Sequence, residues 1–329
     1  MNDHRSMVQT DRLASDGTGI ARAAAILKQG GLVAFPTETV YGLGADATNA
    51  EAVAGIYAAK DRPSFNPLIA HLDSLESARI QGTFDEIAER LAKAFWPGPL
   101  TLVVPAARTC TISDLARAGL DSVALRVPAH LLAHSLLVRT GLPVAAPSAN
   151  RSGRVSPTEA HHVLEDLDGR IDAVLDGGPT LVGVESTIVA CLGGPPRLLR
   201  PGGVAREAIE ALIDQELETG PEATDNPVAP GMLASHYAPR ARVRLNAARI
   251  EPGEAALLFG NARPQGIEAA RAAVNLSENG DLAEAAARLF SALRQLDAAG
   301  PDVITVSPIP ETGLGEAIND RLRRAAAER

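Results

Sequence analysis

A pair of basic side chains marks the first stretch of this sequence that could do chemistry. Lys60 and Arg62 stand where a helical pattern ends, because Pro63 cannot continue a helix and Asn66-Pro67 favours extended backbone. Cations at a helix end often only complement the helix dipole, and the stretch by itself favours that structural role. The competing hypothesis is a phosphate clamp, in which arginine offers a planar fork of donors and lysine a point charge.

Three other stretches could hold an anion or a nucleotide. In "PVAAPSANRSGRVSPT" (143–158) an apolar strand runs into a loop whose hydroxyls and N–H groups could bind phosphate, although ordinary turn-rich loops look the same. Arg200 precedes a Pro-Gly-Gly turn, where a structural ion pair would explain it equally well. "FPTETVYGLGADA" (35–47) matches the dinucleotide fingerprint at its glycines but lacks the strand–turn–helix context, so we expect no nicotinamide site.

Several other chemistries are not expected from this sequence. It has no GKS or GKT for a Walker loop and no GxSxG for an α/β-hydrolase nucleophile. His161 and His162 have no partner at metal-ligand spacing, which argues against a zinc site. His71 is a lone histidine in a strand-like stretch, and such histidines are more often structural than catalytic.

Composition limits the class of protein. The chain has 329 residues, which favours two domains, and hydrophobic residues make up 46% and charged residues 22%. Aromatic residues make up only 3%, so the core must be built from Ala, Val, Leu and Ile. The net charge of −9 argues against a broad nucleic-acid-coating surface. Cys110 and Cys191 are far apart, which predicts no disulfide framework and a reducing, cytoplasmic setting.

The elements that must position these residues alternate between helix and strand. We expect no secretory signal, a loose tail over residues 1–14, no membrane span, and a first α/β domain over 15–213 with a mixed sheet. The patterns predict helices over 19–28, 49–60, 85–95 and 204–213, and strands over 32–35, 67–72, 100–104, 123–127, 143–146, 173–176 and 186–191.

The texture changes after residue 213. Residues 214–231 are acidic, rich in Gly and Pro, and without Lys or Arg, which predicts a linker that we extend to 214–240. A second α/β pattern fills 241–329, with strands predicted over 242–245, 255–259 and 302–306 and helices over 281–297 and 314–327. Two domains joined by a linker are therefore expected.

The order of the motifs carries more information than any one of them. "PTETVYGLG", "KDRP" with "NPL", "WPGPLTLVV", "VALRVPAH", "APSANRSG", "STIV", "LRPG" and "APGMLASHYAPR" follow one another along the chain. Together they resemble the YrdC/Sua family, in the two-domain form of its L-threonylcarbamoyladenylate synthases. The resemblance runs from about Gly19 to the C-terminus and is weaker past Tyr237, where "GLGEAINDRLRRA" (313–325) carries it. The spacer "DRPSFNPL" departs from the family's commoner composition but keeps Lys60, Arg62 and Asn66 in place.

The resemblance implies a fold and a reaction. The fold would be α/β: a YrdC-like twisted mixed sheet around a large open cavity, a linker that acts as a lid over the active site, and a small Rossmann-like C-terminal domain. The enzyme would join L-threonine, bicarbonate and ATP into threonylcarbamoyl-AMP and pyrophosphate. The product would pass to the machinery that transfers the threonylcarbamoyl group to tRNA (the t6A37 modification), with weak tRNA contact an open question.

The resemblance also implies a set of site residues. Those expected to bind ATP are Lys60, Arg62, Asn66, Ser122, Ser148, Ser156, Arg200 and, from the linker, Tyr237; Lys60, Arg62, Ser148 and Asn150 are the catalytic set. Those expected to bind L-threonine are Thr39, His71, Arg126, Ser186 and the backbone of Ala146. Mg²⁺ would be held by the phosphates rather than by protein side chains.

This gives a hypothesis for the two cations at the helix end. The helix would stop so that Lys60 and Arg62 project into the cavity. The substrates that meet there would both be anions, and two like unit charges about 4 Å apart repel by roughly 4 kcal/mol at an effective dielectric of 20. Fixed cations would offset that repulsion between the substrates. The hypothesis requires Lys60, Arg62, Ser148 and Arg200 to converge. The rival hypotheses are a module that binds RNA or a nucleotide without turnover, and a domain that transfers carbamoyl groups to another acceptor.

Overall fold

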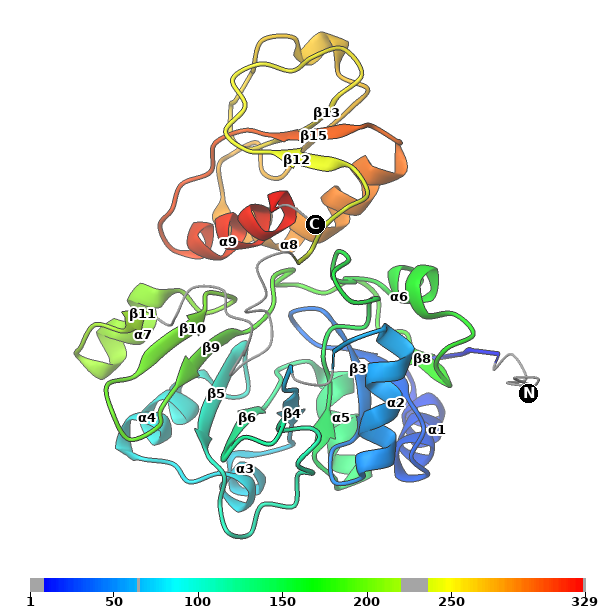
Figure 1. Cartoon of the computed structure of the whole chain (residues 1–329), viewed down its shortest axis with the longest axis vertical. Helices are drawn as coiled ribbons and strands as arrows, with labels where there is room; N and C mark the ends of the chain where they lie inside the picture. Colours follow the sequence, from blue (N-terminus) through cyan, green and yellow to red (C-terminus); the bar gives the residue numbers. More distant parts are fainter. Residues whose placement is uncertain (1–8, 64–65, 220–235, 328–329) are drawn as a thin grey trace.

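The computed structural model describes residues 9–63, 66–219 and 236–327, which form two α/β domains (Figure 1). The larger N-terminal domain is built on one sheet of eleven strands, and the smaller C-terminal domain has a sheet of four. Within the described ranges, no helix combines the length and apolar character needed to cross a membrane. Residues 220–235 of the predicted linker, and residues 1–8 of the predicted tail, lie outside the described residues.

The N-terminal sheet is mixed, as the sequence predicted. Its spatial order is β1-β8-β2-β3-β7-β4-β6-β5-β9-β10-β11. The pairs β2/β3, β3/β7, β4/β7, β5/β6 and β9/β10 are antiparallel, and the remaining pairs are parallel. The strands are β1 (Asp11–Leu13), β2 (Val33–Pro36), β3 (Tyr41–Asp46), β4 (Ile69–His71), β5 (Leu100–Pro105), β6 (Ser122–Arg126), β7 (Val144–Ala145), β8 (Ala173–Leu175), β9 (Thr187–Ala190), β10 (Arg197–Arg200) and β11 (Glu218–Thr219).

Several helices of this domain, though not all, begin at a residue whose side chain caps them. Asp16, Asn49, Ser74 and Asp85 each accept hydrogen bonds from N–H groups of the first helical turn, which would otherwise lack partners. The buried clusters consist mainly of Ala, Val, Leu and Ile, as the composition predicted. The helices are α1 (Gly17–Lys28), α2 (Ala50–Lys60), α3 (Leu75–Gln81), α4 (Glu86–Phe95), α5 (Leu131–Thr140), α6 (Ala160–Leu167) and α7 (Arg206–Ile213).

Two parts of the sequence prediction need correction here. Residues 11–13 are not part of a loose tail, because they form β1 and pair in parallel with β8. The start of the predicted linker is also ordered into the sheet, since Glu218–Thr219 forms β11 beside β10. Both additions extend edges of the sheet, where short strands without a strong hydrophobic pattern can still gain backbone hydrogen bonds.

The glycines of "YGLG" serve packing rather than a phosphate turn. Gly42 and Gly44 lie within strand β3, and a Cβ on Gly42 would stand 3.1 Å from that of Ala146. A Cβ on Gly44 would come within 2.8 Å of the Phe35 ring. The loop after β7 therefore approaches β3 closely, with Leu43 N–H donating to Pro147 O at 2.7 Å. This contact positions the Ser148 loop against the centre of the sheet.

The C-terminal domain presents its helices to the N-terminal domain (Figure 1). Its strands β12 (Arg242–Arg244), β13 (Ala255–Leu258), β14 (Ala272–Asn275) and β15 (Val303–Val306) are all parallel, in the order β12-β15-β13-β14. Helices α8 (Leu282–Ala298) and α9 (Leu314–Ala326) pack on one face. The short η1 (Ile267–Ala269) packs with Ile250 on the other. The parallel sheet agrees with the predicted α/β pattern, and helices α8 and α9 lie between it and the first domain.

Candidate active site

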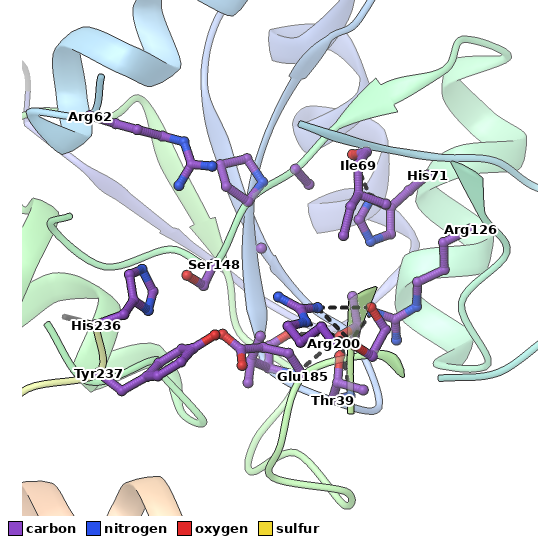
Figure 2. Close-up of a pocket in the computed structure, with 16 residues that line it drawn as sticks. Thr39, Arg62, Ile69, His71, Arg126, Ser148, Glu185, Arg200, His236 and Tyr237 are labelled. Carbon is purple, nitrogen blue, oxygen red and sulfur yellow. Dashed lines mark hydrogen bonds between the residues drawn. The ribbon is translucent and has the colours of Figure 1, made fainter. Parts of the chain in front are cut away.

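A pocket lies over the centre of the N-terminal sheet, and Figure 2 shows the side chains around it. Its cavity volume, with the part open to solvent left out, is about 40 Å³, which is room for a few water molecules. His236 and Tyr237 form one wall, so the pocket is less open than the wide cavity that the sequence predicted. The predicted site residues that line it are Thr39, Arg62, His71, Arg126, Ala146, Ser148, Ser186, Arg200 and Tyr237.

The end of α2 places Arg62 in the pocket wall and Lys60 outside it. Asp61 adopts left-handed backbone with φ of 52° and ends the helix, and Arg62 N–H then donates to Tyr57 O. Lys60 is 1% exposed and does not line the pocket; its Nζ donates to Ser148 O at 2.5 Å and to Asn150 O. The predicted projection of Lys60 into the cavity is therefore wrong for this structure, because inward-facing loop carbonyls take up its ammonium group. Burial and the neighbouring Arg62 hold the pKa of Lys60 well below its ordinary value.

Arg62 does reach the pocket and is left with spare donors. Its Nη2 makes one long contact to Pro67 O at 3.4 Å, and its Nε is buried without a hydrogen-bond partner among the described residues. No carboxylate within the described ranges pairs with it. Burial lowers the pKa of Arg62 to about 10, so the group stays charged at neutral pH. A buried charge without a counter-charge is costly, so this position favours an anionic ligand.

Arg126 is, by contrast, already paired. Its Nη2 donates to Glu38 Oε1 at 2.6 Å and its Nη1 to Thr39 Oγ1 at 3.0 Å, while Ala129 N–H donates to the other Glu38 oxygen. Both members of the ion pair are almost fully buried. Sequence reasoning did not give Glu38 this role; the structure makes it the group that orients Arg126.

His71 lies beside Arg126 in the same part of the pocket. Its ring meets Phe35 edge-on, with ring centroids 6.2 Å apart. Burial and the nearby Arg126 charge lower the pKa of His71 to about 3, so the imidazole is neutral at physiological pH. Ala146, whose N–H donates to Ile69 O at 2.9 Å, completes this wall. A neutral ring next to a fixed cation suits a polar, zwitterionic ligand.

Arg200 and Ser186 form one unit at the end of β10. Arg200 donates from Nε and Nη2 to Ser186 O, at 3.1 and 2.9 Å, and from Nη2 to Ser186 Oγ. The Ser186 hydroxyl also bonds Thr101 Oγ1 at 2.7 Å. Burial lowers the pKa of Arg200. The convergence required of Arg62, Ser148 and Arg200 is met, and Lys60 stands directly beneath the Ser148 loop.

Besides Lys60, four predicted residues do not line the pocket. Asn150 donates from Nδ2 to the carbonyls of Arg151 and Arg154, and so holds its own loop in shape. Asn66 is buried close to the end of α2, with its Oδ1 unpaired among the described residues. Ser156 donates to Glu185 at 2.9 Å. Ser122 starts strand β6, four residues or roughly 13 Å along the strand from Arg126, so its predicted contact with ATP remains a prediction.

Glu185 and His236 are pocket residues that sequence reasoning missed. Glu185 directly precedes the "STIV" motif, and an acidic residue beside a buried apolar strand was the signal that could have revealed it. Burial alone would raise its pKa, but Arg321 and Arg200 nearby lower the pKa of Glu185 to about 2. His236 precedes Tyr237, and its Nδ1 is buried without a partner among the described residues.

Tyr237 forms the wall opposite Arg126 and His71 (Figure 2). Its side chain is fully buried, with a left-handed backbone φ of 60°. Its hydroxyl finds no hydrogen-bond partner within the described residues. Burial raises the pKa of Tyr237 to about 12, so the hydroxyl remains protonated and can donate to a ligand.

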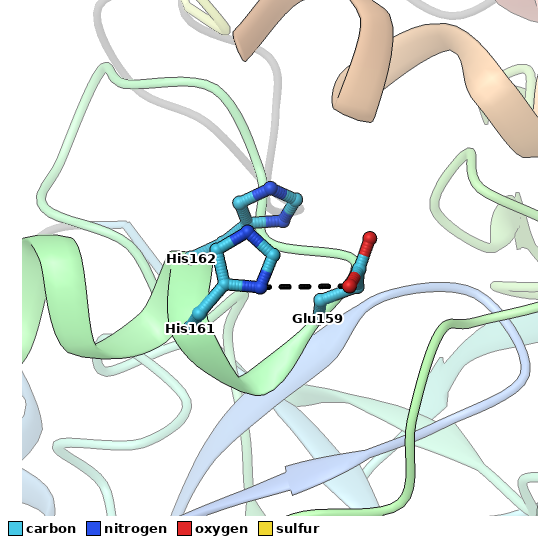
Figure 3. A group of neighbouring side chains, drawn as sticks. All are labelled: Glu159, His161 and His162. Carbon is cyan, nitrogen blue, oxygen red and sulfur yellow. Dashed lines mark ion pairs between the residues drawn. The ribbon is translucent and has the colours of Figure 1, made fainter. Parts of the chain in front are cut away.

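One histidine cluster lies outside this pocket (Figure 3). The prediction that these histidines have no partner is wrong, because ligand atoms of Glu159, His161 and His162 lie within 4.8 Å of one another. His162 Nδ1 nevertheless accepts a long contact from Thr158 N–H, and the nearby Arg294 charge helps to lower the pKa of His162 to about 3, after burial. A cation so close disfavours a second one, and we assign no metal to this cluster.

Comparisons with known proteins agree with the motifs. The family model described as "Telomere recombination" matches residues 25–202, and the model "Threonylcarbamoyl-AMP synthase, C-terminal domain" matches residues 204–327. The threonylcarbamoyl-AMP synthase of Bacillus subtilis (strain 168) is 43% identical over 97% of this chain and 96% of its own length. That of Pyrococcus abyssi is 44% identical over 93% of this chain and 94% of its own length.

A solved structure shares the whole fold. The crystal structure of P. abyssi Sua5 complexed with L-threonine matches with a TM-score of 0.87 and 40% identity, over 96% of this chain and 97% of that one. The chain therefore belongs to the Sua5/YrdC family and has both domains of its threonylcarbamoyl-AMP synthases. This confirms the family resemblance that the order of the motifs indicated.

Proposed function

We propose that this chain acts as a threonylcarbamoyl-AMP synthase, which condenses L-threonine, bicarbonate and ATP for the N6-threonylcarbamoyladenosine modification of tRNA. Relatives at 43% and 44% identity over nearly the full length carry that activity in their names. The observation that carries the proposal is the pocket itself, where motif residues from distant parts of the chain converge with Arg62 and Arg126 on its walls.

The Arg126 end of the pocket is proposed to bind L-threonine. Arginine offers five N–H donors, and the described contacts use one each at Nε, Nη1 and Nη2, so donors remain for a carboxylate. Thr39, His71, Ser186 and the Ala146 backbone would surround the rest of the amino acid. The P. abyssi structure, solved with L-threonine, supports an amino-acid site in this fold.

The Arg62 end is proposed to bind the nucleotide. Arg62, Arg200 and the Ser148 loop would face the phosphates, with Tyr237 on the nucleotide from the other side. Lys60 would act through the loop that it holds, by its contacts to the Ser148 and Asn150 carbonyls. Glu185 is the one carboxylate among the described lining residues, and both its oxygens are engaged by Ser156 and Arg321. Mg²⁺ would therefore be held mainly by phosphates.

The chemistry follows from bringing anions together. The deprotonated amine of threonine would take the carbon of bicarbonate, releasing water and leaving an N-carboxylate. That carboxylate would attack the α-phosphorus of ATP in line, forming the mixed anhydride as pyrophosphate leaves. The fixed guanidinium groups stabilise charge without reorganising, and positioning supplies the remainder. The product would then pass, in the cytoplasm, to the machinery that modifies tRNA.

The test is pyrophosphate release with ATP, bicarbonate and threonine, each omitted in turn. A synthase requires all three, and the expected result is release only in the complete mixture. Release without threonine would contradict the synthase and favour another carbamoyl acceptor. No release, with ATP still bound, would favour a module that binds a nucleotide without turnover.

A further inference from the structure

One arginine of the C-terminal domain lies against the wall of the pocket, fully buried. Arg321 comes from α9, and its Nε donates to Glu185 Oε2 at 2.9 Å. Its Nη1 donates to Pro201 O at 2.8 Å and to Asp320 at 2.7 Å. Glu185 lines the pocket and Pro201 directly follows Arg200. A single side chain of the second domain thus braces two neighbouring parts of the site in the first.

The same guanidinium group also contacts Tyr237. Arg321 Cζ lies 5.3 Å from the centre of the Tyr237 ring, within the range of a cation–π interaction. Phe290 of α8 stacks on the ring as well, with centroids 5.5 Å apart and planes at 28°. The backbone is fixed nearby, because His236 N–H donates to Arg324 O at 3.2 Å. Helices α8 and α9 therefore form a socket for Tyr237.

Charge explains why an arginine is needed at this position. Glu185 is buried between the Ser156 hydroxyl, which donates to one oxygen, and Arg321, which donates to the other. Removing one member of a buried ion pair leaves the other uncompensated, and the remaining charge can only shift or take up a proton. Arg200 lies close enough to influence the same carboxylate. A displaced Glu185 would therefore disturb Arg200, which we propose to face the phosphates.

We propose that Arg321 is a positioning residue for the reaction, through which the C-terminal domain fixes Glu185 and Tyr237 in the pocket wall together. This rests on the function proposed above. Arg321 does not touch the reacting atoms; it acts through a carboxylate on one side and an aromatic ring on the other. Through Arg321, the second domain therefore contributes to the structure of the active site.

The matched control is another ion pair between the domains. Arg206 of α7 pairs with Glu316 of α9 at 2.6 Å, but neither residue lines the pocket or contacts Tyr237. Arg206→Gln therefore weakens docking of the same helix without touching the site. We expect Arg321→Gln to lower kcat/KM for ATP at least tenfold, mainly through KM, and Arg321→Lys to recover part of the loss. Arg206→Gln should stay within twofold of the wild type.

A double-mutant cycle separates positioning from mere stability. Because Arg321 acts partly through Tyr237, the loss caused by Arg321→Gln should be smaller in a Tyr237→Leu background than in the wild type. Arg206→Gln should cause the same small loss in both backgrounds. Additive losses for Arg321 and Tyr237, or a loss no greater than that of Arg206→Gln, would overturn the proposal. Should Arg321→Gln fail to fold, the pair Glu185→Gln with Arg321→Met removes both charges, and it should fold with the same rise in KM.

A second readout needs no turnover. Amide hydrogen exchange at residues 236–238 should be faster in Arg321→Gln than in Arg206→Gln, because only the first substitution removes the guanidinium group that packs on the Tyr237 ring. Unchanged exchange in Arg321→Gln overturns the positioning role even if the wild type proves to lack threonine-dependent pyrophosphate release. That second result would instead contradict the proposed function, so the two failures can be told apart.

Discussion

The two ends of the pocket are built on opposite plans. At the Arg126 end, Glu38 and Thr39 already take up the guanidinium group, and His71 is neutral, so the polar groups are in place before any ligand arrives. At the other end, Arg62 Nε, His236 Nδ1 and the Tyr237 hydroxyl are buried without partners among the described residues. A completed network preorganises a site, whereas buried groups without protein partners leave donors and acceptors that a ligand can engage.

The difference also follows the domain boundary. The Arg126 end uses only residues of the N-terminal domain. The opposite wall is assembled from Glu185 and from His236 and Tyr237, which lie in the stretch predicted as a linker, with Arg321 of α9 packed behind them. One end can therefore form when the first domain folds, and the other is complete only when the second domain docks.

The largest effect should come from breaking the completed network. Arg126→Met would leave Glu38 buried without a counter-charge, and we expect the free energy of unfolding to fall by roughly 3–5 kcal/mol. Threonine-dependent pyrophosphate release should fall with it. Denaturant unfolding measures the first effect. The double variant Glu38→Gln with Arg126→Met should recover most of the stability but none of the release; a stable single variant would contradict the preorganised plan.

The pH dependence of the free energy of unfolding tests the ion pair between Glu185 and Arg321, which joins the two domains at the pocket wall. The pKa of Glu185 in the folded chain, about 2, lies below the usual value of 4.5, so the unfolded chain binds the proton first as pH falls. The stabilisation by Glu185 is therefore present above about pH 4.5 and is lost as pH falls toward 2, by an amount on the order of 3 kcal/mol. Stability curves of the wild type and Glu185→Gln should converge over this window. Parallel curves would show that Glu185 carries no such ion pair.

The smallest effect on folding, with a clear effect on catalysis, is expected at the unpaired end. Arg62→Ala should lower kcat/KM for ATP at least tenfold, about 1.4 kcal/mol or more of transition-state stabilisation. Stability should be unchanged or higher, because the substitution removes a buried charge that has no carboxylate partner in the described structure. Steady-state kinetics and thermal unfolding of the same preparation check both statements. An unchanged rate would return Arg62 to a structural role at the helix end.

Local patterns predicted much of the fold. The helices at 17–28, 50–60 and 86–95 and the strands around 33–36, 100–105 and 187–190 follow from periodicity, capping residues and breakers. Strand β3 was missed because its two glycines imitate a turn, and only the packing of Phe35 and Ala146 shows why they are there. The edge strands β1 and β11 were missed because three and two residues are too short for a pattern.

The sequence by itself determined the inventory of the site and the order in which it is laid out: Thr39, Arg62, His71, Arg126, Ser148, Ser186 and Arg200 stand in recognisable motifs. Tertiary structure alone decided which charges are paired. Lys60 holds a loop, Arg126 is paired with Glu38, and Glu185 is bound by Arg321 from 136 positions away. The reason is physical. A motif fixes the type of a side chain, but burial and the groups that fold against it decide whether its charge is paired within the protein or remains available to a ligand.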